Sequence, residues 1–84
     1  MNLNENLTKV NSKDEFIKFV GQLIKDLKNN PETWENPNLD NYLEAMQSWV
    51  EDMEGWENNL SIDISTMNVW QLMANILFAS KIYE

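Results

Sequence analysis

The sequence predicts an all-α fold: a compact three-helix bundle with an extended linker between the second and third helices. Three stretches repeat apolar residues at helical spacing, and capping residues precede the first and the last of them. The chain has 84 residues and no cysteine, so it has room for one core and no disulfide to support it. We therefore expect a single helical domain over residues 1–84, in which residues 1–11 form a loosely ordered lead-in.

The first predicted helix begins after Ser12. Ser12 and Glu15 have the spacing of a capping box, in which the two side chains satisfy backbone N–H groups that the first turn leaves free. Lys25 and Lys28 suit the negative C-terminal end of the helix dipole. The apolar stripe consists of Phe16, Phe19, Val20, Leu23, Ile24 and Leu27, with Ile17 at its edge.

A polar connection with two prolines and four asparagines follows at residues 29–38. Trp34 lies in this connection, and its ring has two possible uses. It either folds back over the core or is offered to a partner. We favour the first, because small domains use such residues as lids.

Residues 39–55 form the clearest amphipathic helix. Seven apolar residues fall within an arc of roughly 120° at about 100° per residue. Asn36 or Asn38 is expected to cap this helix, and Gly55 to end it in the left-handed conformation common after a last turn. The apolar arc consists of Leu39, Tyr42, Leu43, Met46, Trp49, Val50 and Met53, and the opposite side is acidic.

A turn is expected at residues 56–59. Leu60, Ile62 and Ile64 then alternate with polar residues, which predicts an extended linker lying on the core. The last helix is expected to begin between Ser65 and Asn68, and Asn68 has a capping-box spacing to Gln71. This helix is apolar on most sides, which is typical of a buried central helix or of half a dimer contact. Leu72 and Phe78 are the residues expected to be left outside the core.

The charge is unevenly distributed. The chain has 14 acidic residues, six lysines and a net charge of −8, and residues 29–80 hold nine acids and no base. Direct binding to nucleic acid is disfavoured, because few groups could neutralise phosphates. A basic protein partner, such as a nuclease or another toxin, is favoured instead. Without an apolar stretch long enough for a signal peptide or a membrane span, we expect a cytoplasmic protein that does not enter membranes.

Catalytic residue types are scarce. The chain has no histidine, cysteine or arginine, and its serines have no base of a usual type nearby. The adjacent carboxylates Glu51 and Asp52 point about 100° apart on a helix, which does not suit a shared acid–base role. No calcium-binding loop motif is present. The sequence therefore predicts a protein that is not an enzyme and has no cofactor and no metal site.

The acidic side of the central helix has two readings. It is either a solvated face that keeps the protein soluble or a docking surface for a basic protein, with a tryptophan as an aromatic anchor. Under the second reading, the predicted partner-binding residues are Asp40, Glu44, Glu51, Glu54, Trp34 and Trp56.

Several short motifs are spread over the chain: NSKDEF at residues 11–16, WEN at 34–36, YLEA at 42–45, WVEDMEG at 49–55, WQLMA at 70–74, LFA at 77–79 and IYE at 82–84. In these motifs the chain resembles a family of short, acidic bacterial proteins catalogued as a domain of unknown function. The resemblance extends from about Val10 to Glu84 and implies no activity for particular residues. By analogy of type alone, small acidic bacterial proteins are often inhibitors or immunity proteins that neutralise a toxin.

The expected function is thus non-catalytic protein–protein interaction, in which an inhibitor or immunity-type protein occludes a basic partner through its acidic face. Two alternatives remain. One is a structural or regulatory homodimer joined through the last helix. The other is a small-ligand module with a pocket among Tyr42, Trp49 and Trp70.

Overall fold

The computed structural model of the protein describes residues 3–60 and 63–83. Within these ranges the ordered elements are all helical and no strand occurs, which confirms the all-α prediction. Two short helices accompany the three expected long ones, so the simple three-helix bundle with a linker is not what is observed. In chain order the elements are α1 (Leu3–Leu7), α2 (Lys13–Asn29), the 3₁₀ turn η1 (Pro31–Thr33), α3 (Leu39–Glu51), α4 (Met53–Leu60), the 3₁₀ turn η2 (Ile64–Thr66) and α5 (Val69–Ile82).

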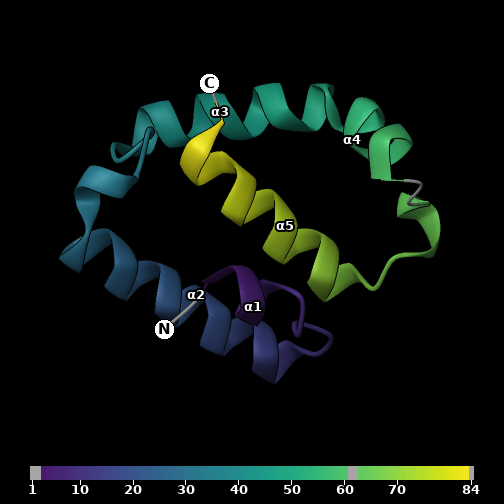
Figure 1. Ribbon diagram of the computed structural model, residues 1–84, viewed down its shortest axis with the longest axis horizontal. Helices are drawn as coiled ribbons and strands as arrows, with labels where there is room; N and C mark the ends of the chain where they lie inside the picture. The colour runs from purple at the N-terminus through teal and green to yellow at the C-terminus, as the bar shows by residue number, and fades with distance from the viewer. Residues whose placement is uncertain (1–2, 61–62, 84) are drawn as a thin grey trace.

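Helix α5 is the centre of the structure. It runs between α2 and α3 and packs against both, while α1 lies across α2 and α5 (Figure 1). The core gathers side chains from the start of the chain, α2, the connection after α2, and α5. Its buried members are Val10, Phe19, Leu23, Trp34 and Ala74.

The start of α2 follows the predicted capping box. The Ser12 hydroxyl oxygen accepts a hydrogen bond from the Glu15 backbone N–H at 3.3 Å. The Glu15 carboxylate accepts from the Ser12 hydroxyl at 3.1 Å and from the Asn11 backbone N–H at 3.2 Å. The return bond therefore goes to Asn11, one residue earlier than in the usual box.

The start of α5 is also capped as predicted. The Asn68 side-chain oxygen accepts from the backbone N–H groups of Trp70 at 2.9 Å and Gln71 at 3.3 Å. The Asn68 amide nitrogen donates to the backbone oxygen of Asn11 at 3.0 Å. The cap therefore also joins the start of α5 to the segment just before α2.

The segment expected as a loosely ordered lead-in holds α1, and it contributes to the core. Val10 is 2% exposed, and Leu3 and Leu7 pack against the buried cluster. The Asn6 side chain donates to Gln22 of α2 at 2.9 Å. These contacts join residues far apart in the sequence, so the local sequence of residues 1–11 does not indicate them.

The central helix ends earlier than predicted. Helix α3 stops at Glu51, and Asp52 leaves helical geometry with its N–H shared among the last carbonyls of α3. Gly55 lies in the first turn of α4, so its predicted role as a left-handed helix end is wrong. Residues 56–59, expected as a turn, belong to α4. Trp56 packs against Trp49 of α3, with 5.3 Å between ring centroids, which holds α4 against the end of α3.

The predicted extended linker is not confirmed. Leu60 belongs to α4 and Ile64 to η2, whereas Ile62 lies outside the described residues. Asp63 organises the start of η2, because its carboxylate accepts from the Ser65 backbone N–H at 3.0 Å and from the Ser65 hydroxyl. The described residues of this alternating pattern therefore include the end of a helix and part of a 3₁₀ turn, and no strand.

Replacement of Asn68 by alanine should lower the free energy of unfolding by about 1 kcal/mol, because both N–H groups of the first turn lose their acceptor. Thermal or urea unfolding measures this loss. Asn68→Asp is the matched control: it keeps the acceptor and loses only the bond to Asn11. If Asn68→Asp is as destabilised as Asn68→Ala, the cap is not the important contact.

Candidate functional site

The four predicted acidic residues are all exposed, and they lie on two helices. Asp40, Glu44 and Glu51 are on α3, at spacings of four and seven residues that place them on one side of the helix. Glu54 is in the first turn of α4. Because the chain leaves helical geometry at Asp52, Glu54 does not continue the α3 row in register.

The two predicted aromatic anchors differ in exposure. Trp34 is only 8% exposed, so it is the lid over the core that we favoured and does not offer its ring to a partner. Its ring packs against Tyr42, with 6.0 Å between centroids. Trp56 is half-buried against Trp49 and keeps part of its ring at the surface.

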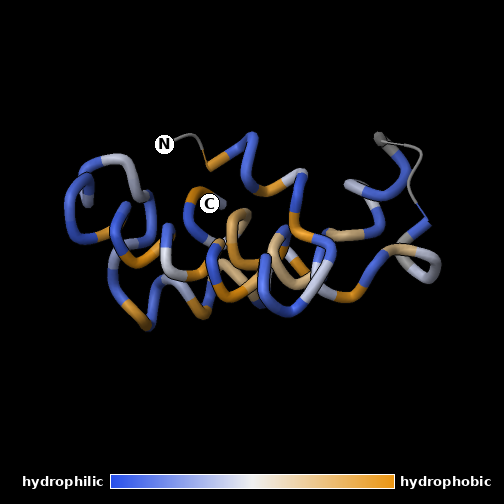
Figure 2. The backbone as a smooth tube through the Cα atoms, turned by 90° about the horizontal axis from the view of Figure 1, so that it is seen from below, coloured by the Kyte–Doolittle hydropathy of each residue, from blue (hydrophilic) through white to orange (hydrophobic). Residues whose placement is uncertain are grey.

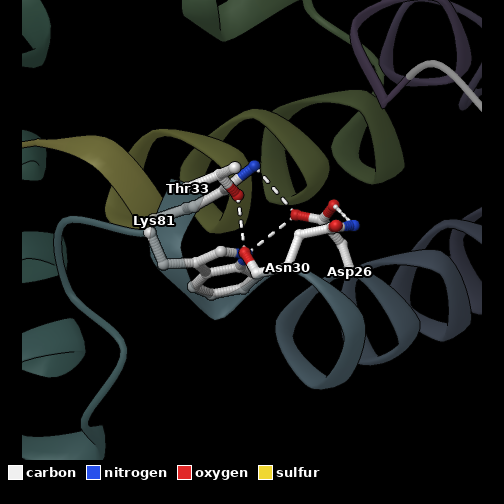
Figure 3. Close-up of polar contacts among 5 residues, drawn as sticks. Asp26, Asn30, Thr33 and Lys81 are labelled. Atoms are coloured by element: carbon white, nitrogen blue, oxygen red, sulfur yellow. Dashed lines mark hydrogen bonds and ion pairs between the residues drawn. The ribbon is translucent and has the colours of Figure 1, made fainter.

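Trp34 belongs to a polar cluster that the sequence did not reveal. The Lys81 ammonium lies 2.9 Å from the Asp26 carboxylate, and the Trp34 indole N–H donates to the same carboxylate at 2.8 Å (Figure 3). The Asn30 amide donates to the other Asp26 oxygen at 3.4 Å. The Lys81 ammonium also lies 5.4 Å from the Trp34 ring centroid, in range of a cation–π contact. We call Asp26, Asn30, Trp34 and Lys81 the Asp26 cluster.

The Asp26 cluster shifts the titration of its carboxyl. The Lys81 ammonium, with a smaller contribution from the Trp34 N–H, lowers the pKa of Asp26 below its usual 3.8, although burial acts in the opposite direction. Lys81 itself is 8% exposed. The sequence gives only a weak indication that Lys81 has a structural role. It is the first lysine after a 52-residue stretch without a base, and it lies in a largely apolar helix.

The connection that carries Trp34 is also bound to the end of α5. The Asn36 side-chain amide donates to the backbone oxygens of Ser80 at 3.1 Å and Tyr83 at 2.7 Å. The Asn36 backbone N–H donates to the backbone oxygen of Lys81 at 3.2 Å. Asn36 is therefore not the cap of α3. That position is held by Asn38, whose side chain makes no capping bond.

Two tyrosines complete the attachment of α3 and α5. The Tyr42 hydroxyl of α3 donates to the backbone oxygen of Leu77 at 2.8 Å, and burial raises the pKa of Tyr42 to about 12. The Tyr83 hydroxyl donates to the Asp52 carboxylate just after α3, and this bond raises the pKa of Tyr83. The two bonds fix the rotation of α3 relative to α5.

That rotation leaves part of the predicted apolar arc of α3 in solvent. Leu39 is 73% exposed, Leu43 51% and Val50 42%. The buried side of α3 is centred nearer to Ala45 and Trp49, which are 7% and 8% exposed. Aliphatic side chains therefore lie beside the acidic row on the exposed side of α3. The predicted apolar arc did not indicate this exposure of Leu39, Leu43 and Val50, because Ala45 on the buried side is not one of its seven residues.

An apolar groove lies between α2 and α3. It has a volume of about 310 Å³ and is lined mainly by carbon. Ile24 and Leu27 form one wall and Leu39 and Tyr42 the other, while Leu77 of α5 lies between them. In Figure 2 hydrophobic residues recur along the edge of the molecule away from the N-terminus. We call this hollow the α2–α3 groove.

The residues expected to be left over on α5 are half-buried. Phe78 packs against the core, and its ring centroid is 5.8 Å from the Lys81 ammonium. The exposed apolar residues of α5 are instead Val69, Met73 and Ile82. Leu72 is likewise only partly accessible. A helix apolar on most sides gives no phase from which its solvent side can be predicted.

The aromatic residues considered for a ligand pocket lie in different places. Tyr42 lines the α2–α3 groove, Trp49 lines a separate hollow with Ala79 and Ile82, and Trp70 packs against Phe16 with 5.5 Å between centroids. Within residues 3–60 and 63–83, no three acidic groups come together as a metal site would require. No helix in the same ranges has the length and apolar character needed to cross a bilayer.

The fold and surface define a small all-helical protein with an acidic and aliphatic exposed helix. Residues 12–84 match the family described as a family of unknown function, DUF7660, and the chain belongs to this family. This match confirms the resemblance to a family of unknown function that the sequence motifs indicated. No curated protein and no solved structure matches the chain.

Replacement of Lys81 by methionine should lower the free energy of unfolding by about 2 kcal/mol, because it leaves the Asp26 carboxylate without its cation. The loss falls below the 3–5 kcal/mol of a fully buried pair, since both side chains keep some solvent contact. The double variant Asp26→Asn/Lys81→Met should recover part of this loss, because no charge then remains. Urea unfolding measures the stability of the wild type, of Lys81→Met and of the double variant. Equal stability of Lys81→Met and the double variant would contradict a coupled pair.

The Asp26 cluster should also make stability depend on pH. Because the folded pKa of Asp26 is depressed, its contribution is fully present above the unfolded value of 3.8 and is lost as pH falls through the folded pKa. The difference in unfolding free energy between the wild type and Asp26→Asn should therefore be constant near neutral pH and shrink below 3.8. Urea unfolding at matched pH values measures it. A difference that persists unchanged in acid would refute the ionic contribution.

Proposed function

We propose that this protein is a non-catalytic interaction module that binds a basic protein partner through the exposed side of α3 and the start of α4. One observation carries the proposal: Asp40, Glu44 and Glu51 are exposed in one row beside the exposed aliphatic residues Leu39 and Leu43. A face that is only a solvated surface needs the acids but not the neighbouring aliphatic side chains. Their combination is typical of a surface that docks onto another protein.

The charge explains how such a partner would be attracted. Residues 29–80 contain nine acids and no base, so the surface around α3 and α4 has one sign of charge. A field of one sign raises the association rate of an oppositely charged protein, and salt reduces this effect. The aliphatic residues Leu39, Leu43 and Val50 would then supply the apolar contact that slows dissociation.

The rigidity of α3 supports the same role. Tyr42 ties the helix to the backbone of α5, and Trp49 is buried at its other end. The exposed side chains therefore project from a fixed helix, which lowers the ordering cost of binding. Trp56 extends this surface onto α4 as a partly exposed aromatic residue, whereas the buried Trp34 acts by positioning the connection.

The finer assignment is an inhibitor or immunity-type protein that occludes the positively charged surface of a nuclease or another toxin. An acidic, partly apolar helix fits a surface that itself binds phosphates, and direct binding of this chain to nucleic acid is disfavoured by the same charge. A cytoplasmic setting is part of this proposal, because a chain without cysteine needs no oxidising compartment.

The proposal is tested by capturing partners from host lysate with two matched variants. Asp40→Asn/Glu44→Gln/Glu51→Gln removes the α3 row, and Asp14→Asn/Glu32→Gln/Glu35→Gln removes the same charge elsewhere. The wild type and the second variant should retain one basic protein that the first variant loses. With that partner purified, the first variant should bind about 10-fold more weakly and with a flatter salt dependence.

Two results would contradict the proposal. Equal loss of binding in both variants would show that net charge, and not the α3 row, is responsible. Equal recovery of the same proteins by all three baits would reduce the acidic row to a solvated surface. Circular dichroism of each variant checks that the helical content is unchanged.

A further inference from the structure

The two faces of the layer formed by α2, α5 and α3 are covered unequally. On one face α1 packs against α2 and α5, with Asn6 hydrogen-bonded to Gln22 and Gln71 hydrogen-bonded to the backbone of Leu7. On α2 the groove-lining residues Val20 and Ile24 lie on the opposite side of the helix from Gln22, at about 100° per residue. Within residues 3–60 and 63–83, no helix therefore covers the face that contains the α2–α3 groove.

Seven exposed apolar side chains lie on this uncovered side by helical phase. We call them the apolar face. Ile24 and Leu39 stand on opposite walls of the groove, and the other members on α2 and α3 are one to three turns away from them. On α5, Val69 and Met73 precede the groove residue Leu77 by two turns and one turn. A monomeric protein rarely exposes so many neighbouring apolar residues without a binding role. The seven are Ile17 (56% exposed) and Ile24 (51%) of α2, Val69 (58%) and Met73 (39%) of α5, and Leu39 (73%), Leu43 (51%) and Val50 (42%) of α3.

The dimensions of this face suit a protein interface. The molecule measures 34 × 27 × 17 Å along its principal axes, and Figure 1 views it down the shortest of these. The broad side, which contains the apolar face, therefore lies within a rectangle of about 900 Å². A standard stable interface buries about 800 Å² on each partner. A single flat partner of similar size would cover the apolar face.

The charges at the two edges of the apolar face are opposite. On α2, the exposed residues Lys25 and Lys28 follow Ile24 by one and four positions, which places them on the outer side of the helix. On α3, Asp40 and Glu44 follow Leu39 and Leu43 by one position each, on the corresponding outer side. The α2 edge is thus rich in lysine, and the α3 edge is wholly acidic.

We propose that the apolar face binds a second copy of this chain, about a two-fold axis that lies in the plane of this face, midway between α2 and α3. This axis places α2 of each copy over α3 of the other, so that apolar side chains meet in the middle and each lysine edge meets an acidic edge. A uniformly basic partner would be repelled by Lys25 and Lys28, and a uniformly acidic partner would be repelled by Asp40 and Glu44. A second copy of this chain carries both signs of charge at the matching separation.

This association can be tested without any other protein, because it needs only a second copy of this chain. It covers Leu39, Leu43, Val50, Asp40 and Glu44, on which the proposed function also relies, so a second copy and a basic partner would compete for this side of α3. The association differs from a dimer through α5 alone, since most of the apolar face belongs to α2 and α3. Glu51 and Glu54 lie toward the far end of α3 and on α4, away from the two lysines at the end of α2, and stay exposed in the dimer.

The test is the mass of the purified full-length protein by sedimentation equilibrium over micromolar to millimolar concentrations. The wild type should rise from the monomer mass of 9.9 kDa toward twice that value. Leu43→Glu and, independently, Ile24→Glu should remain monomeric. Ile82→Glu is the control: it makes the same change at an exposed residue of α5 that lines a different hollow, and it should associate like the wild type.

The two-fold arrangement has a separate test by charge reversal. Lys25→Glu/Lys28→Glu should raise the dimer dissociation constant at least about 10-fold, and so should Asp40→Lys/Glu44→Lys. A mixture of these two variants, or a chain carrying both pairs, should recover association. Circular dichroism confirms that each variant is folded.

Three results would overturn the proposal. A wild type that stays at 9.9 kDa at the highest concentration would exclude self-association. If Ile82→Glu dissociates as fully as Leu43→Glu, the contact between copies is not confined to the apolar face. Failure of the reversed charges to restore association would refute the pairing of α2 with α3.

Discussion

The ion pair between Asp26 and Lys81 is the contact on which the arrangement of the three long helices depends. It joins the end of α2 to the end of α5, and the Trp34 indole shares the same carboxylate. The end of α2, the connection that follows it and the end of α5 are therefore held at one point. An ion pair sheltered from water is strongly directional, because each charge must keep its partner to offset the loss of hydration. The pair thus selects one position of α5 against α2, where apolar packing alone would tolerate several.

The exposed surface of α3 follows from this arrangement. Once α5 is fixed, Tyr42 reaches the Leu77 carbonyl, and Ala45 and Trp49 turn inward. Leu39 and Leu43 then have no core position left. Their exposure is a consequence of how α3 is rotated, and it creates both the mixed surface beside the acidic row and one wall of the α2–α3 groove. The same rotation that completes the core thereby generates the surface to which we assign binding.

Local features of the fold were predictable from the sequence, and contacts between distant residues were not. Ser12 and Asn68 act within three residues of themselves, so their capping roles could be recognised from spacing alone. Lys81 and Asp26 are 55 positions apart, and nothing in either neighbourhood indicates the other. The acidic row could be found by periodicity. The exposed leucines beside it could not, because periodicity gives the width of an apolar arc but not the part of it that a neighbouring helix will cover. Gly55 shows that a local signal can also mislead. It is a residue typical of helix ends, but it lies inside α4, which Trp56 holds against α3.

Helix α5 is attached to the rest of the chain at both ends, by Asn68 to Asn11 at its start and by Asn36 to Ser80 and Tyr83 at its end. All of these bonds close loops of more than 40 residues, so none can re-form independently once the chain opens. Local fraying of α5 is therefore suppressed from either terminus. Its amide protons are exchanged with solvent mainly when the whole domain opens, whereas α4, which packs chiefly against the end of α3, is free to open alone. The protein thus joins a cooperative unit centred on α5 to a peripheral helix of lower local stability.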